Sequence, residues 1–352
     1  MTDSIQVISW NILNPDPDFV KMSLRPVVNQ STGKRNFSPP VYERSRKLAV
    51  INEKRYHSQR KPNILGIIAK WFSDNPTRFV LCLQEVCPDM YAELMSMYGE
   101  NRIRKTNLPD IKPEKVEEKV VLKEIDDYRC TLISDDLEFL ESGDINLKIE
   151  DVRKNALYTK VQIKDTEIQF DCVNLHNFYT WADKNLLQVF QTIFGVLSQS
   201  DRFFICGDFN KPYERIYEIM RKISVDYKDG RLYMPAINNH QNSFTSFNTR
   251  PRNNRINPPS VVNGFLSLQV IDHIIVGNRF SMPKNPKIIS KINNREIFYN
   301  LSGIETMLRK HELLNLKEEN SGRILEEWQK HKFKNISDHK PVIARIDILP
   351  KP

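Results

Sequence analysis

Six short segments place polar residues where strand-like runs of apolar residues begin or end. They are Ile8–Leu13, Leu83–Val86, Asn174–Asn177, Cys206–Asn210, Val270–Ile274 and Ser337–Val342. Carboxylates that converge raise one another's pKa values unless a cation compensates for their charge. A hard divalent cation does so, and Mg²⁺ typically combines one or two carboxylates with waters and substrate phosphate. If the segments converge, their residue types suit metal-assisted chemistry on a phosphate ester, although each segment alone is an ordinary strand terminus.

Length and composition are those of a large folded protein. The 352 residues are 40% hydrophobic and 10% aromatic, which excludes global disorder. No apolar stretch approaches the ~20 residues of a membrane span, and the N-terminus runs into a strand pattern without the features of a secretory leader. We therefore expect a soluble intracellular protein. The formal net charge of +8 favours a polyanionic partner without identifying it.

The cysteines argue against a disulfide framework and against a zinc site. Their number, five, is odd, and no C-x-x-C pair occurs. Most of them lie inside apolar runs, as core thiols do. We therefore expect reduced, buried thiols.

Runs rich in Val, Ile and Phe predict β-strands. The predicted strands are Ile5–Leu13, Phe79–Gln84, Arg129–Ser134, Ala156–Ile163, Ile168–His176, Phe203–Phe209, Val270–Val276 and Val342–Ile348. Several of them are apolar at nearly every position. This pattern is typical of strands that are covered on both faces.

Helical patterns fall between some of these strands. The clearest is Trp181–Ser200, whose apolar residues form a single stripe, and Asn63–Phe72, Asp89–Tyr98 and Tyr213–Ile223 predict further helices. In contrast, Ala156–His176 predicts a hairpin. Helices between some strands and a hairpin between others indicate a layered α/β sandwich in one domain, residues 1–352, rather than a strict βαβ repeat.

Three segments have the composition of insertions. Residues 14–62 contain several prolines and are basic near their end, and residues 247–259 combine arginines with Asn and Pro. Residues 277–334 separate two predicted strands and predict two polar helices, Leu301–Leu316 and Gly322–His331. These helices could gate a site or bind a partner, or they could be a decorated loop without a function.

Together and in this order, the six segments resemble the signatures of the endonuclease/exonuclease/phosphatase superfamily, which has the DNase I-like fold. The signatures are an S/T-W/Y-N strand, Q-E, N-x-H, G-D-x-N, I/R-D-x-I and a terminal S-D-H, and the resemblance runs from Asn11 to His339. It implies a four-layer αββα sandwich, here with polar insertions at about 14–62 and 277–334. It also implies a metal-dependent phosphoric ester hydrolase, which we expect to be a monomer.

The resemblance implies a metal site for Mg²⁺ or Mn²⁺. Glu85 is then the principal ligand, and Asn11 supports it through its carboxamide. Asp338 contributes directly or through a water molecule. The bound ion would polarise the phosphoryl oxygen and neutralise charge on the leaving oxygen.

The resemblance also implies catalytic roles. Asp208 orients and deprotonates the attacking water, and Asn210 hydrogen-bonds the nucleophile or a phosphate oxygen. His176 and His339 donate to the non-bridging oxygens, where charge accumulates. Asp272 pairs with His339 and keeps it cationic beside phosphate. In some members of the superfamily such an Asp–His pair is assigned the base role, and the sequence leaves both allocations open.

Two further candidates concern substrate contacts, and one histidine has a structural interpretation. The resemblance makes Asn11 a substrate contact beside Asn210 and His176. Thr245 lies where the superfamily often has a substrate-contacting segment, with a plain strand as the alternative. His273 follows Asp272 on one strand and therefore points to the opposite face, so we expect a packed, non-catalytic histidine.

The substrate class is open because the fold hosts several chemistries on one metal site. We favour a nuclease that hydrolyses RNA or DNA phosphodiester bonds, because the first two motifs look most like those of nucleases and deadenylases. Basic residues within 44–61 and 250–255 could follow a phosphate backbone, with a solvated basic face as the alternative. Several aromatic residues are available to stack on unpaired bases: Tyr42, Tyr56, Phe178, Tyr179 and Trp181.

Two other functions remain. Ser337–Val342 is very similar to the ending of inositol polyphosphate 5-phosphatases, so a phosphatase acting on inositol polyphosphates or phosphoinositides is the alternative. The P-x-W-x-D-R segment of that group is missing before and around Asp272, which argues against it. A non-catalytic binding module is the third possibility, but none of the motif residues has been lost.

Overall fold

The computed structural model describes two large β-sheets and the helices that cover them. The described residues are 3–12, 54–74, 78–116, 119–149, 152–177, 183–200, 202–226, 246–248, 260–262, 266–269, 271–277, 280, 284–288, 291–292, 295–296, 337 and 339–349. Within these ranges, no helix combines the length and the apolar character that crossing a membrane requires.

The first sheet has six strands in the order β15-β18-β1-β2-β6-β3. Their bounds are Lys284–Ile288 (β15), Val342–Asp347 (β18), Ser4–Asn11 (β1), Phe79–Val86 (β2), Tyr128–Ile133 (β6) and Ile103–Lys105 (β3). Strand β1 pairs parallel with β2 and antiparallel with β18. Two helices, α3 (Lys61–Asp74) and α4 (Pro88–Tyr98), pack on the outer face of this sheet.

The second sheet has seven strands, in the order β14-β10-β9-β8-β4-β5 with β7 also paired to β8. Their bounds are Asp272–Val276 (β14), Phe203–Asp208 (β10), Gln169–His176 (β9), Val152–Ile163 (β8), Asp110–Val116 (β4), Lys119–Ile125 (β5) and Leu137–Ile149 (β7). Strands β9 and β10 are parallel, and β14 is antiparallel to β10. Helices α5 (Asp183–Val196), which continues into the short helix η2 (Leu197–Gln199), and α6 (Tyr213–Asp226) cover its outer face.

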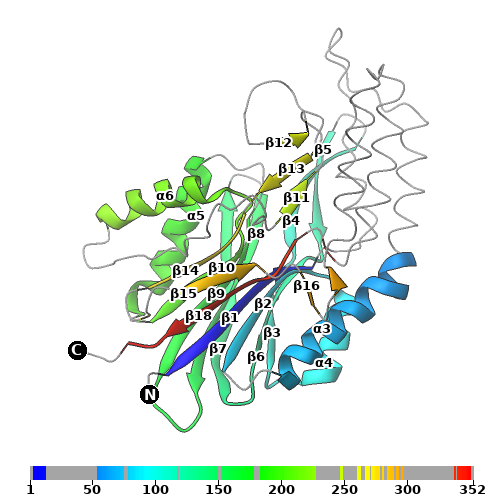
Figure 1. Cartoon of the computed structure of the whole chain (residues 1–352). Coiled ribbons are helices and arrows are strands. Elements are labelled where there is room, and N and C mark those ends of the chain that lie inside the picture. Colours follow the sequence, from blue (N-terminus) through cyan, green and yellow to red (C-terminus); the bar gives the residue numbers. More distant parts are fainter. Residues whose placement is uncertain are drawn as a thin grey trace.

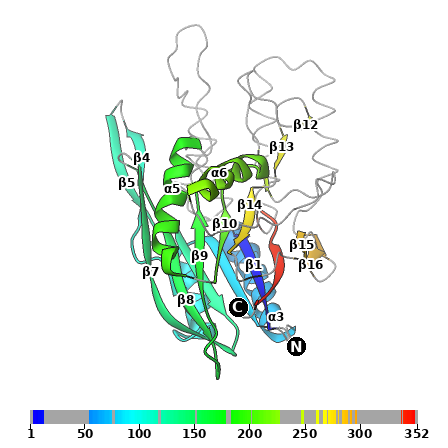
Figure 2. The same ribbon diagram turned by 90° about the vertical axis from the view of Figure 1, so that its left-hand side faces the viewer.

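The layers follow the alternation of side chains along the central strands. In β1, Ile5 and Val7 face the space between the sheets, whereas Ile8 and Trp10 face α3 and α4. Because both faces of the central strands are buried, their sequences are apolar at nearly every position. Figures 1 and 2 show the resulting order of helices, sheet, sheet and helices. The predicted αββα sandwich is confirmed.

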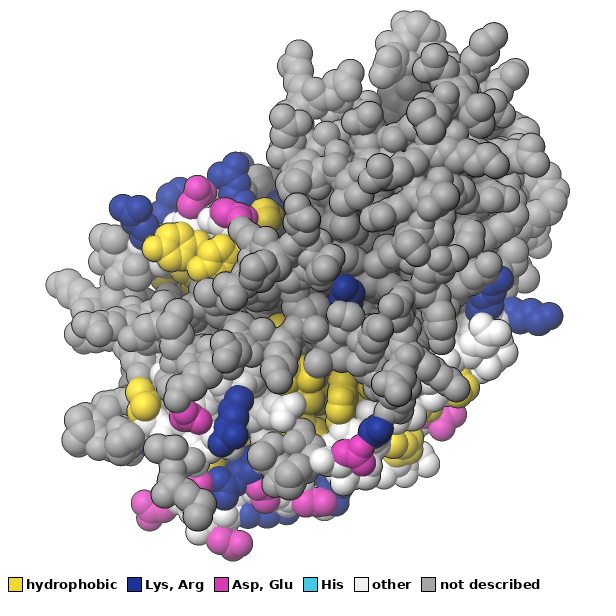
Figure 3. Space-filling model, in the orientation of Figure 1, with side chains coloured by type: hydrophobic (Ala, Val, Ile, Leu, Met, Phe, Trp, Pro, Cys, Tyr) yellow, Lys and Arg dark blue, Asp and Glu magenta, His cyan; other side chains and the backbone are white. Residues whose placement is uncertain are grey.

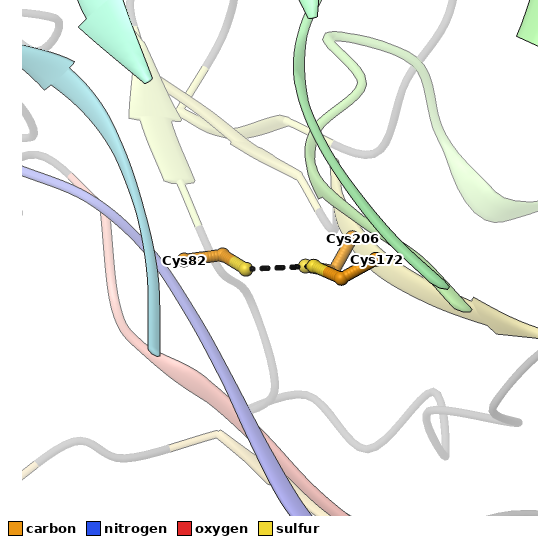
Figure 4. A group of neighbouring side chains, drawn as sticks. All are labelled: Cys82, Cys172 and Cys206. Atoms are coloured by element: carbon orange, nitrogen blue, oxygen red, sulfur yellow. Dashed lines mark hydrogen bonds between the residues drawn. The ribbon is translucent and has the colours of Figure 1, made fainter. Parts of the chain in front are cut away.

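The cysteines lie in the core, as predicted, and all five are buried and free. Cys82 projects from β2 toward Cys172 of β9 and Cys206 of β10, across the space between the sheets (Figure 4). The sulfur atoms of Cys82 and Cys172 are 3.6 Å apart. The surrounding cluster is apolar, so these thiols pack as small hydrophobic side chains.

The eight predicted strands and four of the predicted helices are present in the described residues, but several strands had not been predicted. The longest is β7, whose outward residues are exposed, and β3, β4 and β5 were also missed. Strand β15, inside the expected insertion 277–334, pairs with β18. The remaining short strands are β11 (Ser246–Asn248), β12 (Ser260–Val262), β13 (Leu266–Gln269), β16 (Lys291–Ile292) and β17 (Arg295–Glu296). The predicted helices Leu301–Leu316 and Gly322–His331 lie outside the described residues.

The end of the expected insertion 14–62 is part of the core. A π-helical turn, η1 (Tyr56–Arg60), leads into α3, and Tyr56 and Arg60 are each 2% exposed. The Arg60 guanidinium donates to the backbone oxygen of Ile12. The prediction that Tyr56 and Arg60 offer surface contacts to nucleic acid was therefore wrong, because both are required for packing beneath β1.

Candidate active site

Strand register brings the ends of five motif strands to one place. In the first sheet, Asn11 at the end of β1 lies opposite Gln84, which precedes Glu85. In the second sheet, Asp208 at the end of β10 lies opposite His176 on one side and Asp272 on the other. Neighbouring parallel strands end at the same edge, so this register follows from the strand order.

Contacts between the sheets join these ends into one site. The Asn11 amide nitrogen donates to Glu85 Oε1 at 3.0 Å and to Asp208 Oδ2 at 3.1 Å. His176 Nε2 lies 3.6 Å from Glu85 Oε1 and 3.8 Å from Asp208 Oδ2. The structure thus brings together predicted residues of both sheets, and Asn11 supports the two carboxylates as a hydrogen-bond donor.

His339 completes the site from the segment that precedes β18. Its Nδ1 lies 2.9 Å from Asp272 Oδ2, and its Nε2 lies 3.6 Å from Asp208 Oδ2. The Trp10 indole donates to the backbone oxygen of His339 at 3.1 Å, which ties this segment to β1. The Asp272–His339 pair that the sequence predicted is present.

The site is electrostatically unusual because its charged groups are nearly inaccessible to water. Burial raises the pKa of Asp208 to about 7, and the Asp272 carboxylate adds to this increase. His339, the Asn210 backbone amide and the Asn11 side chain oppose it. Asp208 is therefore placed to exchange a proton near neutral pH, as a general base requires.

Two site residues have backbone conformations in the left-handed region. Glu85 has φ 57° and Asn210 has φ 52°, which non-glycine residues adopt only when the surroundings impose it. Two hydrogen bonds hold Asn210 in this conformation. Its backbone amide donates to Asp208 Oδ1, and its side-chain amide donates to the backbone oxygen of Asn177. The turn after β10 is thus built around the Asp208 carboxylate.

Oxygen donors dominate the part of the site where a metal ion was predicted. Glu85 and Asp208 supply carboxylates that both accept a hydrogen bond from the Asn11 side chain. Carboxylate oxygens are ligands that suit a hard divalent cation. The described donor atoms of Asp208, Asp272 and His339 also lie within 4.8 Å of one another. In that group His339 Nδ1 is already hydrogen-bonded to Asp272.

Some predicted residues are described and others are not. Thr245 and Asp338 lie outside the described residues. His273 is buried on the opposite face from Asp272, where its Nε2 lies 2.9 Å from the Lys211 oxygen, so the prediction of a packed histidine is confirmed. No role had been predicted for Ser337. Its hydroxyl donates to the backbone oxygen of Asn11 at 2.6 Å and accepts from the backbone amide of His339.

Sequence analysis also missed residues that support the site from behind. Gln84 and Asn174 belong to the motifs, and their amides hydrogen-bond across the two sheets at 2.7 Å. Lys154 and Asp127 are buried beside His176 Nδ1, at 3.2 and 3.4 Å. Lys154 and Asp127 were marked in the sequence only as charged residues next to an apolar strand run, and that signal alone is ambiguous.

Charges in this layer set the protonation of His176. Burial and the Lys154 ammonium lower its pKa to about 3, although Asp127 opposes this decrease. Burial alone would raise the pKa of Asp127, but Lys154, Arg129 and His176 together hold it well below its usual value. These shifts favour the neutral imidazole of His176 and the ionised carboxylate of Asp127.

Comparison with known proteins supports the fold. No protein-family model and no curated protein matches the chain. Among solved structures, an endonuclease/exonuclease/phosphatase family protein of Bacteroides thetaiotaomicron matches with a TM-score of 0.54 and 16% identity, over 100% of both chains. A D. rerio TDP2 solved with a single-strand DNA product matches with a TM-score of 0.52 and 11% identity, over 98% of this chain and 99% of that one.

A third solved structure shows that the fold carries other substrates. The mannosyl-6-phosphatase of Bacteroides thetaiotaomicron matches with a TM-score of 0.52 and 16% identity, over 97% of this chain and 99% of that one. Identities this low relate the folds and leave the activities open. From these full-length matches and its two helix-covered sheets, the chain has the fold of the endonuclease/exonuclease/phosphatase family, as its motifs predicted.

Proposed function

We propose that the protein is a divalent-metal-dependent phosphoesterase whose substrate is a phosphodiester bond of RNA or DNA. The observation that carries the proposal is the contact of Asn11 with both Glu85 and Asp208, which places carboxylates of the two sheets at one point. The Asp272–His339 pair beside Asp208 adds a second proton-handling group. Such a combination suits activation of water and stabilisation of charge on phosphate.

Mg²⁺ or Mn²⁺ is the proposed cofactor. Glu85 would hold the ion, Asn11 would orient the Glu85 carboxylate, and Asp338 is the further proposed ligand from the sequence motif. When bound, the ion would polarise the phosphoryl oxygen and neutralise charge on the leaving oxygen.

The residues of the chain would perform the remaining steps. Asp208 would orient the attacking water and accept its proton, for which a pKa of about 7 is suited. His176 and His339 flank Asp208 through their Nε2 atoms, where they would donate to phosphate oxygens. Asp272 would hold the ring of His339 through Nδ1. Asn210, at the turn after Asp208, would contact the nucleophile or the phosphate.

Nucleic acid is the substrate we favour, and the support comes from a protein of the same fold and from the net charge of the chain. A protein of the same fold, D. rerio TDP2, was solved with a single-strand DNA product, and the net charge of this chain is +8. On the described part of the face in Figure 3, however, Lys and Arg side chains lie among Asp and Glu side chains. The ammonium of Lys61, in the basic segment, forms ion pairs with Asp89 and Glu93, so its charge is already compensated within the protein.

Phosphomonoesters are the alternative substrates. The mannosyl-6-phosphatase has this fold, and Ser337–Val342 is similar to the ending of inositol polyphosphate 5-phosphatases. The same carboxylates and histidines could serve such a reaction, because only the leaving group differs. The two substrate classes must therefore be compared directly.

A substrate panel separates the candidates. We would incubate the full chain with Mg²⁺ and labelled single-stranded RNA, single- and double-stranded DNA, an abasic duplex, a 5′-tyrosyl DNA end, an inositol polyphosphate and mannose 6-phosphate. We expect cleavage of at least one nucleic acid, its loss with EDTA, and its recovery with added Mg²⁺. Turnover of the monoesters alone would overturn the nuclease assignment, and undiminished activity in EDTA would overturn the metal assignment. Glu85→Gln is the inactive control.

Mg²⁺ should also stabilise the folded protein. An ion that binds only the native state raises the free energy of unfolding by about 2.7 kcal/mol at a free concentration of 100 times Kd. We expect the thermal midpoint to rise with Mg²⁺ in the wild type, and not in Glu85→Gln. Glu141→Gln changes an exposed carboxylate of β7 and is the matched control, which should respond like the wild type. An equal rise in all three proteins would show that Mg²⁺ acts elsewhere.

A further inference from the structure

Strands β4 and β5 form a hairpin that continues the second sheet beyond the candidate active site. Strand β7 pairs with β8 along one edge, from Val152 to Ile163. Strand β9 pairs with Leu157–Gln162 of β8, and β4 pairs with Arg153 of β8. A strand has only two edges, so β9 and β4 share the other edge of β8 and follow one another along it.

Strands β9 and β4 meet beside the catalytic residues. Strand β9 ends at His176 and β4 begins at Asp110. The Lys154 ammonium lies between them, 3.2 Å from His176 Nδ1 and 3.2 Å from Asp110 Oδ2. On the side away from β8, β10 pairs with β9 and β5 pairs with β4. The hairpin therefore extends the sheet past the strand ends that carry His176 and Asp208, and Figures 1 and 2 show it projecting from the rest of this sheet.

Both ends of the hairpin are fixed to the wall of the site. The buried Asp110 carboxylate accepts from the Asn155 backbone amide at 3.1 Å and from the Arg129 guanidinium. Two residues after β5, Asp127 Oδ2 lies 3.4 Å from His176 Nδ1. Buried ions are tolerated when they are paired and hydrogen-bonded, as they are here. The position of the hairpin relative to the site is therefore set at its two ends.

The register of the hairpin places two lysines directly opposite each other, Lys112 and Lys123. Like charges at directly opposite positions, about 4.5–5.5 Å apart at Cβ, destabilise an antiparallel pair. Alternation along the strands puts these positions on the face of Asp110, which already pairs with other cations. Glu114 is diagonal to Lys123, at about 7–8 Å, so one more distant carboxylate faces two cations. An anion from outside the hairpin would remove the repulsion.

We propose that Lys112 and Lys123 bind a phosphate of the nucleic-acid strand next to the scissile bond, so that the β4–β5 hairpin is a substrate-binding arm. This deepens the proposed function and rests on it. Lys112 lies two residues beyond Asp110, about 7 Å along the strand, which is within reach of the phosphates beside the scissile one. Ammonium groups only donate and phosphate oxygens accept, so one phosphate satisfies both lysines.

Replacing both lysines tests the arm. Lys112→Thr/Lys123→Thr removes the two charges and keeps residues that suit a strand. We would titrate the full chain in EDTA with a fluorescein-labelled single-stranded oligonucleotide over a series of NaCl concentrations. We expect Kd to rise about tenfold at low salt, and the slope of log K against log salt to fall by about 0.7, the value for one phosphate contact of a single strand. An unchanged Kd and slope would overturn the proposal.

Lys160→Thr/Lys164→Thr is the matched control. It removes the same charge at, or just beyond, the end of β8 that is distant from Arg153, and should keep the wild-type Kd and slope. An equal loss in both variants would show an effect of net charge and overturn the assignment to the hairpin. At low salt, relief of the repulsion should leave the thermal midpoint of Lys112→Thr/Lys123→Thr at or above that of the wild type. A lower midpoint would show that the lysines stabilise the fold instead.

Kinetics separate this proposal from the proposed function. With Mg²⁺ and the oligonucleotide, Lys112→Thr/Lys123→Thr should raise KM with little change in kcat. Bis(p-nitrophenyl) phosphate has no neighbouring phosphate, so its kcat/KM should equal that of the wild type, and a loss on both substrates would contradict a role in strand binding. A raised KM for inositol polyphosphate alone would overturn the assignment to nucleic acid. A wild type that neither binds nor cleaves the oligonucleotide contradicts the proposed function, whereas cleavage by a wild type that the variant equals contradicts the arm alone.

Discussion

Replacing Asp208 by asparagine should lower the kcat of phosphoester hydrolysis about a thousandfold and should make the metal-free protein more stable at pH 8. Loss of a positioned general base typically costs 10²- to 10⁴-fold, about the size expected here. Asparagine keeps the shape of the side chain and can still accept from the Asn210 amide, so the turn should survive. A variant with near-normal turnover would remove the assigned role of Asp208.

The gain in stability has a defined pH dependence. Asp208 has a pKa of about 7 in the folded protein, against the ordinary pKa of 3.8 for a free aspartate side chain. Below both values the carboxyl is protonated in either state, and between them the unfolded chain ionises first. The folded protein therefore loses stability as the pH rises toward 7, and the loss is complete above it. Asp208→Asn removes this loss, on the order of 4 kcal/mol at pH 8 for a pKa shift of about three units.

Urea unfolding in EDTA at pH 4 and pH 8 measures the effect. The variant should exceed the wild type at pH 8, and the difference should shrink at pH 4. An equal difference at both pH values would show that Asp208 is not the titrating group. Asp272→Asn then decides between the two allocations of the base: if the Asp272–His339 pair accepts the proton, that variant should lose as much kcat as Asp208→Asn.

Replacing Gly207 by alanine should prevent the protein from folding stably. A Cβ at this position would lie 1.8 Å from the backbone oxygen of Leu175, its partner on the parallel strand β9. The backbone also has φ 148°, which side chains rarely adopt. Because the obstacle is backbone, relief requires β10 to move away from β9, and Asp208 is the next residue. We expect a loss of more than about 4 kcal/mol, in the range of severe core lesions.

Gly195→Ala is the matched control for this prediction. Gly195 lies in helix α5, and a Cβ there meets nothing within 4 Å. Alanine is the better helix former by about 0.5–1 kcal/mol, so this variant should unfold at a slightly higher urea concentration than the wild type. Expression, circular dichroism and urea midpoints compare the two. A Gly207→Ala protein with the wild-type midpoint would show that β9 and β10 are not held at this distance.

Both predictions concern the end of β10, where much was readable from the chain. Gly207, Asp208 and Asn210 follow an apolar run, and a short run that is apolar at every position is typical of a strand between two layers. Strands β4, β5 and β7 were missed for the same reason in reverse. Their sequences mix charged and apolar residues, and a mixed pattern does not distinguish strand from loop; in β7 several of these residues are exposed.

The sequence by itself determined the order of the motifs, the residue types of the site and the layered fold, because these depend on local patterns of apolar and polar residues. Only the tertiary structure decided which side chains meet. It placed Tyr56 and Arg60 in the core, joined Glu85 to Asp208 through Asn11, and set Lys154 against His176. These contacts join residues of different strands, and the contact of Asn11 with Asp208 crosses from one sheet to the other, whereas local patterns carry no information about such distances.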